Sequence, residues 1–103
     1  MVRDSFAINT AFAFINECKT AGLTFRKVLL FGSYATGNFT EDSDIDLLLI
    51  SDQFTDNIFD NLKLYSRINI KYPIIETHPH STTSYNNGNE FIEEIEKSTI
   101  VIA

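Results

Sequence analysis

The stretch VLLFGSYATG, residues 28–37, followed by SDIDLLLI, residues 43–50, decides the fold of this chain. Each segment contains a run of four large apolar residues, and each run is bounded abruptly by glycine or polar residues. Short apolar runs of this kind are typical of strands that are buried on both faces. We therefore expect strands over Phe25–Phe31 and Ile45–Ile50, joined by a helical turn at Ser33–Gly37 and then an exposed loop.

Helical periodicity is found on both sides of these two strands. Apolar residues recur at spacings of three and four between Asp4 and Ala21, which predicts a helix that starts at Asp4 or Ser5 and is terminated by Gly22. The remaining segments predict a long helix at Phe54–Lys71, a strand at Tyr72–His80, a turn-rich linker at Ser81–Asn89, a short helix at Glu90–Lys97 and a last short strand at Ile100–Ile102. This order of elements indicates an α/β (α+β) fold, in which helices flank a small mixed β-sheet.

The size and composition of the chain are those of one compact domain. Its 103 residues are within the usual range for a single domain, so we assign residues 1–103 to one domain. Apolar residues make up 44% of the chain and are spread along its length, so the chain can fill a core. The first helix carries Phe6, Phe12 and Phe14, more apolar surface than one face of a small sheet requires, which indicates a protein interface, including that of a homo-oligomer.

Charge and targeting patterns limit the classes of function. The formal charge of −6 and the lack of a Lys/Arg cluster make polymeric nucleic acid an unfavourable partner. Cys18 is the single cysteine, so no intramolecular disulfide can form, which indicates a reducing compartment. The N-terminus lacks a secretory pattern, and no stretch approaches the roughly 18 apolar residues of a membrane span. We therefore expect a cytoplasmic protein without a membrane partner.

Two features of the opening stretch carry chemistry. Gly32 directly follows a buried strand and lets the backbone turn sharply and approach a ligand, while Ser33 offers a hydroxyl at the start of the next helical turn. This turn suits a phosphate. Asp44 and Asp46 are two residues apart on a strand, so their side chains leave the same face with Cα atoms roughly 6.5 Å apart. Two carboxylates so placed repel each other unless a cation lies between them.

Magnesium is the cation that fits this carboxylate pair. It takes one or two carboxylates and completes its octahedron with waters and substrate phosphates, so metal and nucleotide would arrive together. With two ions about 3.5 to 4 Å apart, such a site lowers the pKa of an attacking hydroxyl and stabilises the departing pyrophosphate oxygens of an in-line displacement. Catalysis then consists of positioning and electrostatics.

The same residues resemble a known family. Gly32-Ser33, ten intervening residues and Asp44-Ile45-Asp46 match the Gly-Ser-x10-Asp-x-Asp signature of the DNA polymerase β-like nucleotidyltransferase superfamily, in its minimal, single-domain branch. The resemblance covers nearly the whole chain. It implies a small mixed sheet flanked by helices, a nucleoside triphosphate substrate such as ATP, and a third carboxylate on a later strand. Thr36 stands where many relatives carry an arginine; if that arginine helps hold phosphates, this departure implies weaker nucleotide binding.

Glu76 is our candidate for the third carboxylate. It lies in a segment that resembles the family's third strand, and it is the only acidic residue between Asp60 and Glu90. In that role it completes a metal site or accepts the proton of the attacking hydroxyl; the competing interpretation is a solvated carboxylate at a strand end. His78 and His80 share strand parity with Glu76, so an acid-His-His metal site is geometrically possible, although surface histidines are the interpretation that we favour.

The resemblance also implies an acceptor. The minimal branch resembles the antitoxin half of bacterial two-gene modules whose other half is a helical HEPN-type ribonuclease toxin. It implies transfer of AMP from ATP, with Mg²⁺, to a tyrosine hydroxyl of such a toxin, and 103 residues leave no room for the acceptor-binding helical domain of larger members. Two alternatives stay open: a regulatory antitoxin that neutralises its partner by occlusion, and a small-molecule transferase that acts as an assembled dimer or heteromer.

Overall fold

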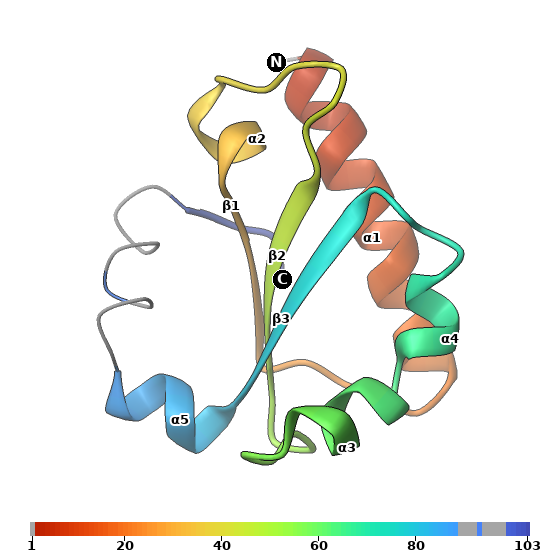
Figure 1. Cartoon of the computed structure of the whole chain (residues 1–103), viewed down its shortest axis with the longest axis vertical. Coiled ribbons are helices and arrows are strands. Elements are labelled where there is room, and N and C mark those ends of the chain that lie inside the picture. The colour runs from red at the N-terminus through yellow and green to blue at the C-terminus, as the bar shows by residue number, and fades with distance from the viewer. Residues whose placement is uncertain (1, 89–92, 94–98) are drawn as a thin grey trace.

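The computed structural model describes residues 2–88, 93 and 99–103 (Figure 1). In chain order its elements are α1 (Val2–Thr20), β1 (Lys27–Phe31), α2 (Ser33–Thr36), β2 (Ile45–Ser51), α3 (Ile58–Lys63), α4 (Ser66–Asn69), β3 (Ile75–Ser81), α5 (Thr82–Asn87) and β4 (Ile100–Val101). The helix expected at Glu90–Lys97 lies outside the described residues, apart from residue 93. The expected α/β (α+β) fold with a small mixed sheet is confirmed.

The sheet has both parallel and antiparallel pairs. In the described part of the chain its strands lie in the order β3-β2-β1-β4. β1 runs antiparallel to β2 and β4, whereas β2 and β3 run parallel. Figure 1 shows α2 at one end of the strands and α3 and α5 at the opposite end. The last residue of β1 and the first residues of β2 and β3 therefore meet at the α2 end.

α1 supplies the main apolar layer of the core. Its inward residues recur at spacings of three and four, and each is at most 1% exposed: Ala7, Ala11, Phe14, Ile15 and Cys18. Gly22 ends the helix with a φ of 98°, and the amide of Leu23 donates to the carbonyl of Cys18 at 2.9 Å. This is the Schellman arrangement, so the predicted terminator is confirmed. The helix begins two residues earlier than expected and ends one residue earlier.

The two faces of the sheet differ in what covers them. The face toward α1 and α4 (Figure 1) carries Val28, Leu30, Ile45, Leu47, Leu49 and Ile75. The opposite face carries a smaller apolar cluster of Leu29, Phe31, Leu48 and Ile50, against which Tyr85 of α5 packs. Both predicted apolar runs are thus buried on both faces, as their composition indicates. We call the side that bears the smaller cluster the open face.

The prediction of one long helix at Phe54–Lys71 is wrong. The chain instead forms the short helices α3 and α4, separated at Tyr65, whose φ of −145° and ψ of −3° are not helical. Asn61 is only 3% exposed, and its side chain hydrogen bonds to both the amide (2.7 Å) and the carbonyl (2.8 Å) of Thr55. These bonds hold Thr55 outside a helix, because side-chain amides compete with helical hydrogen bonding. The apolar residues Ile58, Phe59 and Leu64 of this stretch are 49%, 72% and 39% exposed, so they do not form a buried helix face.

The turn-rich linker expected at Ser81–Asn89 is also wrong, because residues 82–87 form α5. Ser81 is its N-cap, and its hydroxyl accepts a hydrogen bond from the amide of Ser84 at 3.0 Å. The strand expected at Tyr72–His80 begins only at Ile75, since the preceding residues turn through a bond from the amide of Ile75 to the carbonyl of Tyr72. The last short strand is confirmed as β4, which pairs with β1.

The phenylalanines and the cysteine of α1 differ in how far they are buried. Phe14 is fully buried, so it belongs to the core and not to the predicted interface, whereas Phe6 and Phe12 are 51% and 40% exposed. Cys18 is buried, and burial raises the pKa of its thiol to about 12. Among the described residues, no helix combines the length and the apolar character that crossing a bilayer requires.

Candidate active site

The carboxylates of Asp46 and Glu76 are neighbours across two parallel strands. Asp46 is the second residue of β2, and its Cα partners are Phe31 in β1 and Glu76 in β3. Paired residues of adjacent strands project to the same face of a sheet, here the open face. The two acids are thus brought together at the α2 end, although they are 30 positions apart in the sequence.

Gly32 lies directly against Asp46. A Cβ at position 32 would lie 2.2 Å from Oδ2 of Asp46, a distance that real Cβ atoms do not adopt. The φ of 76° at Gly32 is also strained for a residue with a side chain. Both the close approach and the left-handed backbone therefore require glycine at this position. Ser33 follows as the first residue of α2, beside the same carboxylate end of the sheet.

Asp44 stands at the entrance to β2, one residue before the strand begins, and is exposed. A tight turn precedes it: the amide of Ser43 donates to the carbonyl of Thr40 at 3.1 Å, and the amide of Thr40 donates to Oγ of Ser43 at 2.8 Å. The carboxylate of Asp44 is close enough to act on the charge of Asp46. All three predicted acids thus lie at one end of the sheet, with Asp44 at the periphery.

His78 joins the two central acids. Its Nε2 lies 3.9 Å from Oδ1 of Asp46 and 4.0 Å from Oε1 of Glu76. The ring packs edge-on against Phe31, with 5.0 Å between ring centroids. Its side chain is 29% exposed, whereas that of Glu76 is 57% exposed. Our favoured interpretation of His78 as a surface histidine is therefore wrong.

The electrostatics of this group reflect crowding of like charge. Burial raises the pKa of Asp46 to about 6, and the hydrogen bond and charge of Glu76 and the charge of Asp44 act in the same direction. Burial lowers the pKa of His78, against the opposing effect of the Glu76 carboxylate. Near neutral pH the group thus presents carboxylates beside a neutral imidazole, the protonation forms that bind metal ions.

A hydrogen-bond network behind the strand fixes β3 in place. The hydroxyl of Thr77 donates to Oδ1 of Asn69 at 3.0 Å, and Nδ2 of Asn69 donates to the carbonyl of Ile75 at 3.1 Å. The hydroxyls of Tyr65 and Thr77 are 2.9 Å apart. Side chains alternate along a strand, so Thr77 faces the core while its neighbours on the open face belong to the acidic group. This network therefore sets where the functional face of β3 lies.

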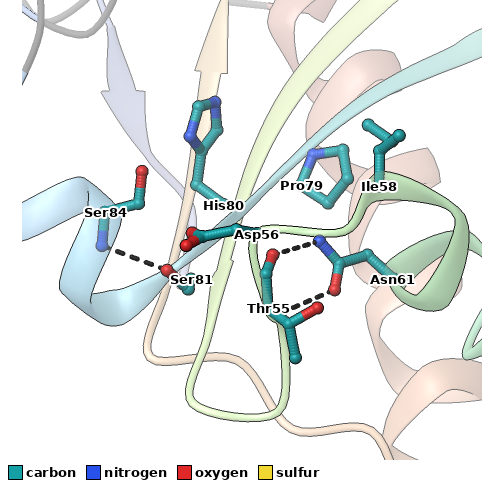
Figure 2. Close-up of a pocket in the computed structure, with 8 residues that line it drawn as sticks. All are labelled: Thr55, Asp56, Ile58, Asn61, Pro79, His80, Ser81 and Ser84. Atoms are coloured by element: carbon teal, nitrogen blue, oxygen red, sulfur yellow. Dashed lines mark hydrogen bonds between the residues drawn. The ribbon is translucent and has the colours of Figure 1, made fainter.

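His80 occupies a different place from His78. It lines a pocket of about 220 Å³ with Thr55, Asp56, Ile58, Asn61, Pro79, Ser81 and Ser84. Figure 2 shows its ring near the junction of β3 and α5, which is the end of β3 remote from Glu76. Within the described residues, the possible metal-binding group comprises Asp46, Glu76 and His78, without His80. In the sequence, His78 stands out only because it lies two residues from Glu76 and therefore on the same face of the strand. His80 lies four residues from Glu76 and has the same property.

The residues present fit a divalent cation. One ligand atom each from Asp46, Glu76 and His78 lies within 4.8 Å of the other two. Burial and, next to it, the neighbouring Glu76 raise the pKa of Asp46, and a cation between the two carboxylates would favour their charged forms. Asp46 and Glu76 are the carboxylates that would hold such an ion, with His78 beside them, whereas Asp44 is not part of this group.

A mixed sheet that places a glycine-serine turn against clustered carboxylates has the layout of a site that could hold a nucleotide phosphate beside a divalent cation. The comparison with known families agrees: the model of the nucleotidyltransferase domain matches residues 13–102, so the chain belongs to this family.

Two known proteins are similar to this chain. Over 50 residues the chain is 42% identical to a protein of Methanocaldococcus jannaschii named "Putative protein adenylyltransferase MJ0604". The aligned part is 48% of this chain and 47% of that protein, so the chain matches about half the length of this relative. A crystal structure of a "putative nucleotidyltransferase" from Sulfolobus solfataricus has a TM-score of 0.69, covering 96% of this chain and 81% of that one at 19% identity. That likeness shows the shared fold.

Proposed function

We propose that this nucleotidyltransferase transfers AMP from ATP to a hydroxyl group of a partner protein, with a divalent metal ion. The observation that carries the proposal is the approach of Asp46 to both the Gly32 backbone and the Glu76 carboxylate. A triphosphate seated on the Gly32-Ser33 turn would lie beside these acids. The name of the M. jannaschii relative, a protein adenylyltransferase, supports the choice of a protein acceptor.

The residues have separate roles in this proposal. Gly32 and Ser33 bind the nucleotide, because the missing side chain leaves the turn open and the serine adds a hydroxyl. Asp44, Asp46 and Glu76 bind one or two Mg²⁺ ions, which supply charge neutralisation at the phosphates and the leaving pyrophosphate. Asp46 is the more buried anchor of the group, with a side chain 22% exposed.

The transfer step balances without a further co-reactant. The acceptor oxygen forms a bond to the α-phosphorus of ATP, the bond between that phosphorus and the β-phosphate bridging oxygen breaks, and pyrophosphate leaves. The proton of the acceptor hydroxyl goes to a carboxylate, and Glu76 suits this role because its side chain is 57% exposed and therefore accessible.

The partner that we propose is a HEPN-type toxin, modified on a tyrosine, so that this protein acts as an antitoxin. This choice rests on the resemblance to the minimal, single-domain branch. We also propose that residues 1–103 form one domain, that it works in the cytoplasm, and that the exposed Phe6 and Phe12 of α1 belong to a protein interface, with the toxin or with a second copy.

The test uses ATP labelled in turn at the α- and γ-phosphates, with Mg²⁺ and a purified HEPN-type partner. Label on a partner tyrosine from the α-phosphate but not from the γ-phosphate supports adenylyl transfer. Asp46→Asn should abolish it. Asp56→Asn, which removes an exposed carboxylate that lines the pocket at the other end of β3, should not. Neutralisation of the toxin by Asp46→Asn without any label would replace this proposal with occlusion.

A further inference from the structure

We infer that His78 is a nitrogen ligand of the metal site, so that the site binds first-row transition ions more tightly than its carboxylates alone would, relative to Mg²⁺. This inference rests on the proposed function, because it concerns the ion that serves the same reaction. It adds to the carboxylates a residue of different chemistry, and it makes a separate statement about which ion the protein selects.

The distances support direct ligation. Nε2 of His78 lies 3.9 Å from Oδ1 of Asp46 and 4.0 Å from Oε1 of Glu76. Oxygen and nitrogen ligands lie about 2.0 to 2.2 Å from a small divalent ion, so two of them span up to roughly 4.2 Å across it. Both separations are within that span. One ion between the three side chains would therefore be in reach of the imidazole nitrogen as well as both carboxylates.

The histidine is held in this position from two sides. Its ring packs against Phe31, the last residue of β1, with 5.0 Å between centroids. Its backbone pairs with Leu48 in the parallel register of β2 and β3. Thr77, the residue before it, is fixed to Asn69 on the opposite face of the strand. The His78 side chain therefore loses little conformational entropy when an ion binds, which favours ligation.

The donor set differs from the one that magnesium prefers. Mg²⁺ is a hard ion that takes oxygen ligands and keeps several waters, whereas imidazole suits Zn²⁺, Fe²⁺, Ni²⁺ and Cu²⁺, and Mn²⁺ has the lowest affinity of the first-row series. Exchanging one oxygen or water for a nitrogen raises the affinity for the transition ions with little gain for Mg²⁺. Mn²⁺ is a suitable probe because it is paramagnetic and substitutes readily in oxygen-rich sites.

The direct test is pulsed electron paramagnetic resonance of Mn²⁺ bound to the protein with a non-hydrolysable ATP analogue, using protein without a histidine tag. The chain has two histidines, His78 and His80. We expect modulation from a directly bound ¹⁴N nucleus, which changes to the ¹⁵N pattern when histidine is ¹⁵N-labelled. His80→Asn, the matched control on the same strand face, should keep the signal, and His78→Asn should lose it.

The second measurement is the affinity for Mn²⁺ and for Mg²⁺ by competition in the same variants. His78→Asn should lower the affinity for Mn²⁺ by about tenfold or more and that for Mg²⁺ by less than about threefold. His80→Asn should leave both unchanged. Equal losses for the two ions in His78→Asn, or Mn²⁺ bound to the wild-type protein without nitrogen modulation, would overturn the inference.

These outcomes are separable from failure of the proposed function. Mn²⁺ bound without nitrogen modulation, in a protein that still labels its partner with AMP, removes His78 as a ligand and leaves the transfer reaction in place. Nitrogen modulation in a protein that transfers no label with either ion leaves the ligand assignment in place and removes the reaction. Wild-type spectra decide the ligation even if His78→Asn does not fold.

Discussion

Oδ2 of Asp46 lies so close to Gly32 that a Cβ added at position 32 would stand 2.2 Å from it. The backbone turn and the carboxylate therefore occupy their places only together. The Gly-Ser part of the sequence signature is thus a steric counterpart of its second aspartate, in addition to any contact that it makes with phosphate. Variants at position 32 should show this dependence.

Gly32→Ala is expected to damage both stability and ligand binding. The backbone of Gly32, with a φ of 76° and a ψ of −156°, lies in a region almost confined to glycine and costs about 1 to 3 kcal/mol for a residue with a side chain, and the clash with Asp46 adds roughly 1 to 3 kcal/mol. Gly88→Ala is the matched control, since Gly88 has a similar backbone, with a φ of 71° and a ψ of 165°, but no heavy atom within 4 Å of an added Cβ. Urea unfolding and ATP titration of both variants measure the difference. Equal losses in the two variants would show that the clash is relieved without cost.

Asp46→Asn is expected to stabilise the metal-free protein at neutral pH. The folded-state pKa of Asp46 is raised from 3.8 to about 6, so its contribution to stability is fully present below about pH 4 and is lost as the pH rises through 6. The variant escapes this loss and should gain on the order of 1 to 2 kcal/mol over the wild type at pH 7.5, allowing for partial exposure of the carboxylate, and nothing near pH 3.5. Chemical denaturation in a chelator at both pH values measures this.

Mg²⁺ and an ATP analogue should change the stability of the wild type but not that of Asp46→Asn. Ligands that bind only the folded state raise its stability by mass action, so the wild type should gain and Asp46→Asn should not. A wild type that is already more stable than the variant at pH 7.5 in chelator would contradict the assigned repulsion between Asp46 and Glu76.

Asn69→Ala is expected to weaken metal binding from a position outside the site. The substitution removes the bonds to the carbonyl of Ile75 and the hydroxyl of Thr77 that fix β3, and should cost about 1 to 3 kcal/mol. Asn61→Ala is the control, because its side chain makes two comparable bonds, both to Thr55. Both variants should lose stability, but only Asn69→Ala should bind Mn²⁺ less tightly. Unchanged binding in Asn69→Ala would show that this network does not position β3.

Thr36→Arg is expected to strengthen nucleotide binding. Thr36 is exposed, and its hydroxyl donates to the carbonyl of Ser33 within α2 at 3.3 Å, so a longer side chain meets no packed neighbour. A charged contact with phosphate at an exposed position contributes on the order of 1 kcal/mol, roughly a fivefold gain in affinity. Titration with ATP measures it, with Thr36→Met as the uncharged control of similar length. An equal gain in Thr36→Met would assign the effect to packing.

Cys18 should be inert toward a thiol reagent in the folded protein. Burial raises the pKa of its thiol to about 12, so very little thiolate forms at pH 8. Reaction with Ellman's reagent should be complete in denaturant and slower by orders of magnitude without it. Fast reaction under native conditions would mean that α1 leaves the core readily.

The two apolar runs and the first helix were predictable from sequence because local composition decides them. A strand buried on both faces needs a contiguous apolar run, and the run of Leu47 to Ile50 has no other stable location. The periodicity of α1 and its glycine terminator are equally local. The prediction of one helix at Phe54–Lys71 is wrong although the spacing of its apolar residues is helical. Asn61 forms a hydrogen bond with Thr55, and Tyr65 forms one with Thr77. The spacing of apolar residues does not reveal these polar contacts.

The candidate site was predictable in part for a similar reason. Asp44 and Asp46 follow from a local pattern beside a strand. Glu76 required the family resemblance, because the strand that lies next to β2 is fixed by the parallel crossover and not by local sequence. For the same reason, parity alone offered both histidines, and only the register with β2 distinguishes His78, opposite Leu48, from His80, opposite Ile50.

The parallel pairing of β2 and β3 has a consequence for how this domain can change over evolution. The relative position of Asp46 and Glu76 depends on strand register and on the bonds that Asn69 and Tyr65 make with β3, and not on the path that the chain takes through residues 52–64. Insertions at exposed positions of that stretch, such as Asp56, are therefore compatible with an unaltered reaction centre, whereas the buried Phe54 and Asn61 have to be kept. The connection between β2 and β3 can therefore change in sequence, and with it the specificity for a partner, while the carboxylates keep their positions.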